Sequence, residues 1–157
     1  MQNEFKQNID GENIIVPCVI EFTHGYDLSI YIYQKKSGKL VRNVDVKNIP
    51  LNEFFAYNGK MYLINYEENL IIIDYVQNKR EEIKLNLSKY DITSIIGLKN
   101  SLIFVGTKEL FLYSIQEKKI TGNYNDVSGS IMGNPTIINN IVYFGTYNGL
   151  VYALEGE

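Results

Sequence analysis

Residues 135–154, with the sequence PTIINNIVYFGTYNGLVYAL, decide the fold of this 157-residue chain. The stretch predicts a short strand, a turn at Asn139-Asn140, an aromatic strand ending at Gly145, a turn at Asn148-Gly149 and another strand. An Asn-Gly pair between apolar runs is a strong hairpin signal, because the tight turn needs positive φ at both central positions. The stretch therefore predicts consecutive antiparallel strands joined by short turns.

The same pattern recurs three times upstream, with decreasing clarity toward the N-terminus. The copies cover residues 95–115, 54–75 and 18–33. The positions aligned with Gly145 are spaced by about 40 residues, which is typical of four-stranded β-propeller blades. These positions are Gly106, Asn65 and Thr23.

A fourth extended segment follows a polar turn in each of the first three copies, at residues 40–46, 83–87 and 120–124. No segment shows sustained helical periodicity. We therefore predict an all-β chain, a β-propeller of about four four-stranded antiparallel blades. It forms one domain, 1–157, with approximate blades at 10–46, 47–87, 88–124 and 125–157. The last copy lacks a fourth strand, and we predict that residues 2–8 supply it as a closing outer strand.

Composition and charge exclude several classes of function. The net charge is −3 and the pI is about 5.3, whereas a nucleic-acid binder normally carries a basic stripe. The lysine pairs at 35–36 and 118–119 fall in predicted turns. No apolar run reaches the roughly 18 residues of a membrane span. The N-terminus lacks a signal-peptide pattern and the single cysteine forms no intramolecular disulfide, so we expect a cytoplasmic protein.

The C-terminal copy resembles the repeat of quinoprotein-alcohol-dehydrogenase-like (PQQ-repeat) propellers. A proline precedes a short strand, an aromatic strand ends in glycine, an Asn-Gly turn follows, and a leucine-tyrosine-alanine-leucine-type strand closes the unit. The residues that carry the resemblance are Tyr143, Gly145, Asn148, Gly149, Tyr152, Ala153 and Leu154. With the upstream copies, it covers about residues 10–157.

The chain departs from this family in ways that bear on function. The repeat commonly ends in a tryptophan that locks neighbouring blades, but this sequence has no Trp and 13 Tyr. We expect Tyr, Phe and Ile to take over that packing. The family's enzymes are much longer, with about eight blades, a quinone cofactor and a metal. We therefore expect no cofactor here. A closed ring of four blades, a homodimer that completes a larger ring, and a part of a longer protein remain open alternatives.

The residue types that carry catalysis do not form a recognisable constellation. His24 is the only histidine, and Cys18, six residues away on an extended segment, is too distant to share a metal with it. We expect a turn histidine and a core cysteine. Asp10-Gly11-Glu12 lacks the remaining ligands of a calcium loop, so turn chemistry is the better interpretation. We predict no catalytic residue and no metal site.

Loops at one end of the blades are the best candidates for binding. In an up-and-down blade, the turn between the second and third strands shares an end with the connection to the next blade. Loops on a rigid scaffold concentrate binding residues, and tyrosine suits interfaces because it combines apolar area with a hydroxyl. The predicted binding residues are Tyr26, Asp27, Tyr66, Glu67, Tyr90, Asp91, Asp126, Tyr147 and Asn148.

These observations favour a non-enzymatic module that binds a protein partner through this loop face. An acidic chain suits a basic partner, as in inhibitor or immunity-type proteins. One alternative is a carbohydrate-binding propeller, in which Tyr rings stack on sugars. The other is a fragment of a larger quinoprotein-like enzyme.

Overall fold

The structure, a computed structural model, describes residues 8–22, 25–46, 54–65, 67, 69–85, 87, 92–98 and 100–155. These residues form strands and turns only, which confirms the all-β prediction. No described segment is a helix with the length and hydropathy needed to cross a membrane. The chain divides into two compact units, residues 1–84 and 85–157, and each is described by itself.

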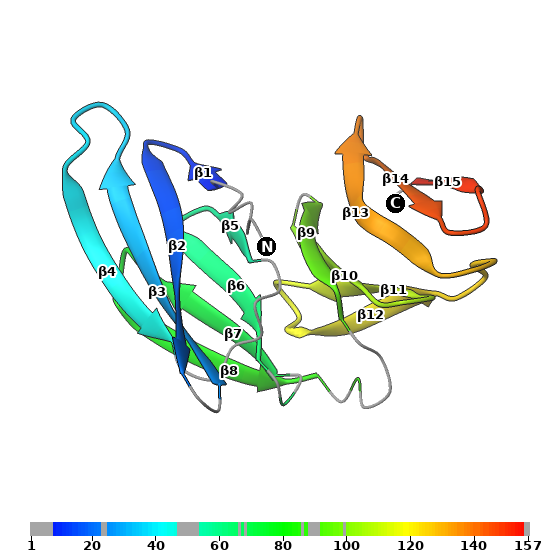
Figure 1. The fold of residues 1–157 in the computed structure, drawn as a ribbon, viewed down its shortest axis with the longest axis horizontal. Helices are drawn as coiled ribbons and strands as arrows, with labels where there is room; N and C mark the ends of the chain where they lie inside the picture. Colours follow the sequence, from blue (N-terminus) through cyan, green and yellow to red (C-terminus); the bar gives the residue numbers. More distant parts are fainter. Residues whose placement is uncertain are drawn as a thin grey trace. The chain divides into compact units, whose positions relative to one another are not determined.

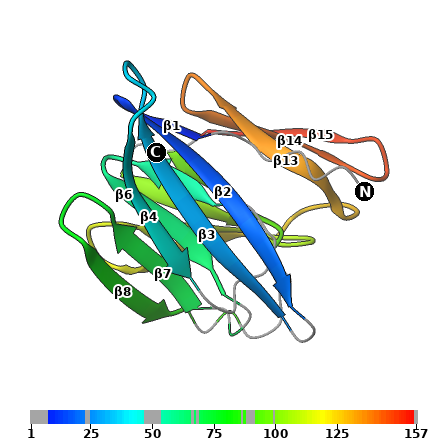
Figure 2. The same ribbon diagram turned by 60° about the vertical axis from the view of Figure 1, so that its left-hand side comes forward.

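Unit 1 contains two four-stranded antiparallel sheets, in each of which every strand pairs with the next along the chain (Figures 1 and 2). The first sheet consists of β1 (Asn8–Asp10), β2 (Asn13–Phe22), β3 (Gly25–Gln34) and β4 (Leu40–Val46). The second consists of β5 (Phe55–Tyr57), β6 (Lys60–Ile64), β7 (Asn69–Asp74) and β8 (Lys79–Lys84).

The core of unit 1 lies between these two sheets. Every second residue of a strand points to the same face, so Leu28, Ile30 and Ile32 of β3 enter the core together. Ile71 and Ile73 of β7 face it from the second sheet. Ile30, Ile32 and Ile71 are completely buried, and each contributes about 1.5–3 kcal/mol relative to an exposed side chain.

A carboxylate clamp also joins the two sheets of unit 1. Asp10, the last residue of β1, accepts hydrogen bonds from the backbone N–H groups of Asn58 (2.9 Å) and Gly59 (2.6 Å). The Tyr75 hydroxyl donates a third hydrogen bond to it. Asn58 and Gly59 have φ values of 51° and 76°, as a tight Asn-Gly hairpin turn requires. Asp10 therefore differs from the turn residue that the sequence predicts: it ends a strand, and its carboxylate binds the turn of a hairpin 48 residues away.

Unit 2 contains a four-stranded and a three-stranded antiparallel sheet with the same strand order (Figure 1). The third sheet of the chain consists of β9 (Ser94–Leu98), β10 (Ser101–Val105), β11 (Leu110–Ser114) and β12 (Lys119–Tyr124). The fourth consists of β13 (Ile131–Ile138), β14 (Ile141–Thr146) and β15 (Val151–Glu155).

Aromatic side chains fill the core of unit 2. Phe144 and Val142 on β14 are buried against the third sheet, where they belong to one cluster with Val105. Tyr152 packs on this cluster and stacks on Phe144 with a ring-centroid distance of 5.0 Å. Tyr124 meets Tyr152 edge-on at 6.5 Å. Within unit 2, Tyr and Phe thus contribute to the packing between the sheets.

Several strand boundaries differ from the sequence prediction. The first residues of the predicted closing strand, 2–7, lie outside the described residues, but Asn8 and Ile9 pair with Ile15 and Ile14 of β2 rather than with the last sheet. β8 begins at Lys79 instead of residue 83, because its first four residues are all charged and exposed and show no apolar alternation.

Cys18 corrects a second expectation. The thiol is exposed, not in the core. Cys18 pairs with Ser29, and Ser29 with Asp45, so this cross-strand row lies on the face of the first sheet opposite the core. His24 lies outside the described residues.

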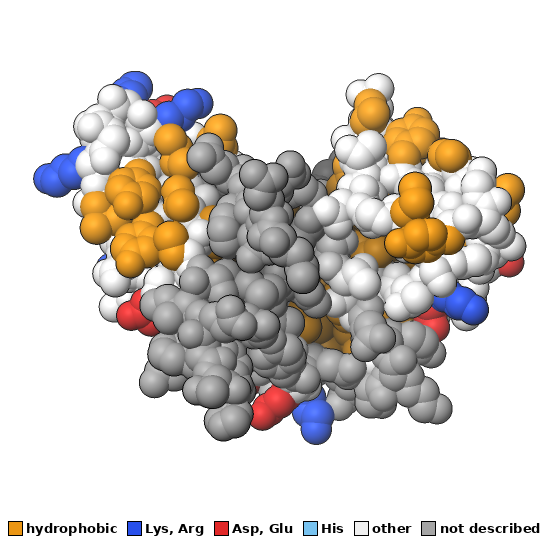
Figure 3. Space-filling model, viewed as in Figure 1, with side chains coloured by type: hydrophobic (Ala, Val, Ile, Leu, Met, Phe, Trp, Pro, Cys, Tyr) orange, Lys and Arg blue, Asp and Glu red, His pale blue; other side chains and the backbone are white. Residues whose placement is uncertain are grey.

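Each unit also has an exposed apolar sheet face (Figure 3). On the first sheet, Ile9, Ile14, Tyr33 and Leu40 form one cross-strand row, in which Ile9 and Leu40 are exposed. On the fourth sheet, Met132 and Val151 flank Gly145 and are exposed. These faces show the same period-2 pattern as the buried ones, as expected for sheets with two apolar faces.

Candidate interaction site

Three segments meet at one end of the two sheets in unit 2, and we call this region the loop end. They are the β10–β11 turn (106–109), the β12–β13 connection (125–130) and the β14–β15 turn (147–150). The backbone N–H of Ile131 donates to Thr107 O at 2.8 Å, and the N–H of Tyr147 donates to Ser130 O at 2.9 Å. The connection is therefore hydrogen-bonded to the β14–β15 turn, and Ile131, the first residue of β13 directly after it, is hydrogen-bonded to the β10–β11 turn.

Tyr147 is the most prominent side chain of the loop end. It is 75% exposed, although the backbone beneath it is fixed. The turn is closed by hydrogen bonds from Thr146 N to Leu150 O (3.0 Å) and from Gly149 N to Thr146 O (2.9 Å). The site thus presents a large amphipathic ring on an ordered backbone.

Asn148 connects the β14–β15 turn to the β12–β13 connection. Its Nδ2 donates to Ser128 Oγ at 2.9 Å, and its Oδ1 accepts a hydrogen bond from the Thr146 hydroxyl. Gly129 has a φ of +85°, and a Cβ on it would lie 2.9 Å from the Asn148 side chain. The connection therefore requires glycine at this position for both conformation and space.

The inner side of the connection is anchored in the core. Val127 and Ile131 pack on the core cluster of unit 2, and the N–H of Ser128 donates to the Tyr152 hydroxyl at 2.7 Å. Asp126 stays exposed on the outer side. A loop whose inner residues are anchored in the core and whose outer residues are polar and aromatic suits the recognition of another molecule. Among the described residues, no group of three or more His, Cys, Asp or Glu is placed to hold a metal ion.

The structure therefore brings together three of the predicted binding residues in unit 2, Asp126, Tyr147 and Asn148. In unit 1, Glu67 is an exposed turn residue whose N–H donates to Asn65 Oδ1 at 3.0 Å. Tyr66, Tyr90 and Asp91 lie outside the described residues.

Tyr26 and Asp27 require a correction, because both are strand residues rather than loop residues. β2 runs to Phe22 and pairs there with Gly25, so the hairpin closes before Tyr26 is reached. Asp27 is partly buried and pairs with Ile20.

Sequence reasoning missed the serines that hold the loop end together. Ser128 and Ser130 supply a side-chain and a main-chain oxygen to the neighbouring turn. The available signal was Gly129 between two serines, since an isolated glycine in a polar connection often marks a close approach.

Comparison with known proteins finds the fold but no family. No family model matches the chain, and no curated protein matches it. Among solved structures, the computationally designed Ika4 protein is 13% identical with a TM-score of 0.71, over 99% of this chain and 92% of that one. The Cps50 (Swd1) β-propeller domain of Myceliophteria thermophila is 14% identical with a TM-score of 0.65, over 91% of this chain and 48% of that one.

This chain has the β-propeller fold. BamB from Moraxella catarrhalis is a further match, 12% identical with a TM-score of 0.64, over 90% of this chain. The chain spans 43% of BamB and 48% of the Cps50 domain, so it corresponds to less than half of these two proteins. At such identities the likeness supports the fold alone.

Proposed function

We propose that this chain is a non-enzymatic module that binds a protein partner, and that the loop end of unit 2 makes the contact through Tyr147. The observation that carries the proposal is a tyrosine with 75% exposure on a turn fixed by hydrogen bonds to a neighbouring loop. Exposed aromatic rings on ordered backbone are typical interface anchors, because binding them costs little conformational entropy.

The surroundings of Tyr147 fit this role. Asp126, Ser128 and Asn148 are exposed in the same loop end and supply polar groups to it. Leu150, 46% exposed on the same turn, extends the apolar area. An apolar centre within a polar rim is the usual anatomy of a protein interface.

The test is affinity capture with matched variants. The immobilised chain is incubated with native lysate, and Tyr147→Ala is compared with Tyr57→Ala, a 42% exposed tyrosine in unit 1. We expect a stoichiometric protein partner with the wild type and with Tyr57→Ala. An interface anchor contributes about 2 kcal/mol or more, so Tyr147→Ala should bind that partner about 30-fold more weakly. Equal capture by both variants would contradict the proposed site.

Two finer points belong to the same proposal. The net charge of −3 supports a basic partner, as for an inhibitor or immunity-type protein, and such binding would weaken with rising salt. The Tyr143 to Leu154 motif supports placing the repeats in the quinoprotein-like class. Specific binding on a glycan array without any protein partner would favour the carbohydrate-binding alternative instead.

A further inference from the structure

Among the described residues, β15 is an edge strand of the fourth sheet. The order of this sheet is β13–β14–β15, whereas each of the other three sheets has a fourth strand beside the strand that corresponds to β15. Because Thr146 N donates to Leu150 O, the antiparallel alternation directs the backbone groups of Tyr152 and Leu154 toward β14. The N–H and C=O groups of Val151, Ala153 and Glu155 therefore point outward.

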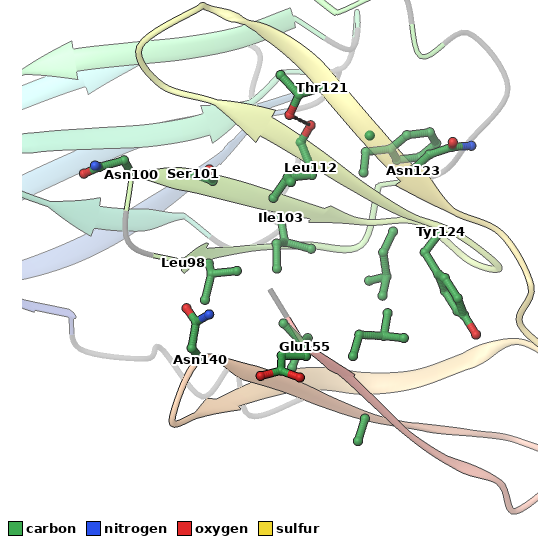
Figure 4. A pocket seen from close by; sticks show the side chains of 16 residues that line it. Leu98, Asn100, Ser101, Ile103, Leu112, Thr121, Asn123, Tyr124, Asn140 and Glu155 are labelled. Carbon is green, nitrogen blue, oxygen red and sulfur yellow. Dashed lines mark hydrogen bonds between the residues drawn. The ribbon is translucent and has the colours of Figure 1, made fainter. Parts of the chain in front are cut away.

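A groove of about 710 Å³ runs beside this open edge. Its apolar lining includes Leu98, Leu112 and Tyr124 from the third sheet, and Val142 and Leu154 from the fourth. Figure 4 shows Leu112 and Tyr124 on the wall formed by the third sheet, with Glu155 at the end of β15.

The exposure of Leu112 indicates what is missing from the groove. Leu112 pairs with Gly122 next to the register shift of the third sheet, and the corresponding residue of the first sheet is Ile32, which pairs with Arg42 next to the same shift. Ile32 is completely buried against a four-stranded sheet, whereas Leu112, which faces the three-stranded one, is 37% exposed. A fourth strand beside β15 would cover Leu112, so its greater exposure agrees with the absence of such a strand among the described residues.

We propose that the open edge of β15 and this groove form a strand-acceptor site, which binds an extended segment of a partner protein by adding it as the fourth strand of the sheet. Main-chain hydrogen bonds to Val151, Ala153 and Glu155 would hold the segment, as in β-augmentation. This surface is distinct from the loop end, and the proposal does not depend on Tyr147.

The chain's own fourth strands define the chemistry of the occupant. In β12, Ile120 pairs with Tyr113 and Tyr124 pairs with Leu110, and the register shift between these pairs places the two half-buried side chains on opposite faces of the sheet. Tyr124 packs on the core of unit 2. β12 begins with Lys119, which pairs with Ser114, the position that corresponds to Glu155. The occupant therefore runs antiparallel to β15, carries an apolar residue on each face, and begins with a basic residue opposite the Glu155 carboxylate.

The probe is a capped synthetic peptide with the sequence of residues 119–124, Lys-Ile-Thr-Gly-Asn-Tyr, titrated into the full chain and followed by NMR. We expect saturable shifts, and at least tenfold slower amide exchange at Val151, Ala153 and Glu155. A peptide with serine in place of the isoleucine and tyrosine should not bind.

Two variants test the site by different routes. Ala153→Pro removes one outward N–H, a change that an edge strand tolerates, and Leu112→Ser removes the apolar wall. Each should weaken peptide binding at least tenfold, whereas Ile138→Ser, a 55% exposed residue on β13 outside the groove, should bind within twofold of the wild type.

Three results would overturn the proposal. The first is no saturable binding by the wild type, and the second is equal binding of the serine-substituted peptide. The third is binding only after residues 1–7 are deleted, which would assign the groove to the chain's own N-terminal segment instead of a partner.

Discussion

Replacing Asp10 with alanine tests whether one carboxylate holds the two sheets of unit 1 together. The side chain accepts hydrogen bonds from Asn58 N, Gly59 N and the Tyr75 hydroxyl. All three donors lie in hairpin turns of the second sheet, between β5 and β6 and between β7 and β8. Alanine removes all three acceptor contacts at once. Tyr75, only 6% exposed, then loses the acceptor of its buried hydroxyl.

The expected loss of stability follows from these contacts. A hydrogen bond to a charged group contributes about 1.5–3 kcal/mol, but Asp10 is partly exposed and water can replace Asp10 at the two backbone donors. We therefore expect Asp10→Ala to lower the free energy of unfolding by about 3 kcal/mol. For a chain of this size, that corresponds to a midpoint lower by about 6–12 °C.

Asp74→Ala is the matched control for this measurement. Asp74 also accepts two backbone N–H groups, from Val76 (3.1 Å) and Gln77 (2.7 Å), but both lie in its own exposed turn. Its loss should cost about 1 kcal/mol. Urea denaturation followed by circular dichroism compares the two variants. If Asp10→Ala is no more destabilising than Asp74→Ala, the clamp does not connect the sheets energetically.

Three further predictions concern other features. Burial and the hydrogen bond to Asp10 raise the pKa of Tyr75. The stabilising contribution of the protonated Tyr75 hydroxyl is therefore complete below about pH 10 and is lost as the pH rises toward the folded pKa. Above about pH 10, the free energy of unfolding of the wild type should fall more steeply than that of Tyr75→Phe. Gly129→Ala should lower the free energy of unfolding, measured by urea denaturation, by about 2 kcal/mol, because residue 129 has a positive φ and a Cβ there would lie 2.9 Å from Asn148. Gly133→Ala is the control: residue 133 also has a positive φ but has open space around it, so the loss should be about 1 kcal/mol. The exposed Cys18 thiol should react stoichiometrically with a disulfide reagent without denaturant, and slow labelling that needs urea would contradict its position.

The sequence predicted the meander of short strands because local turn chemistry specifies it. Asn58-Gly59 and Asn139-Asn140 both have positive φ at their two central residues and join directly paired strands. Asn148-Gly149 shows the limit of this reasoning. Only Gly149 has a positive φ, and the turn closes between Thr146 and Leu150. The aligned strand end of the last copy is therefore Thr146, not Gly145.

The loop end was predicted in part, for a physical reason. Turn residues such as Tyr147 can be found from strand periodicity, because a turn follows wherever an apolar run ends. The hydrogen-bond partners of these turn residues cannot be found in this way. Ser128 and Ser130 are about 20 residues away in sequence, and nothing in the local sequence specifies their contacts. Tyr26 and Asp27 were predicted in a loop, but β3 already begins at Gly25, which pairs with Phe22.

The two edges of the fourth sheet are built differently, and this sets how far any assembly on it can grow. On β13, the pairing with β14 is interrupted between Met132 and Thr136, with Gly133 at a φ of +66° and Pro135 without an N–H. A bulge and a proline are the devices by which sheets block edge-to-edge addition. Growth by strand addition is therefore one-sided: β15 can take one guest, β13 can take none, and copies of this sheet cannot polymerise end to end into a fibre through these two edges.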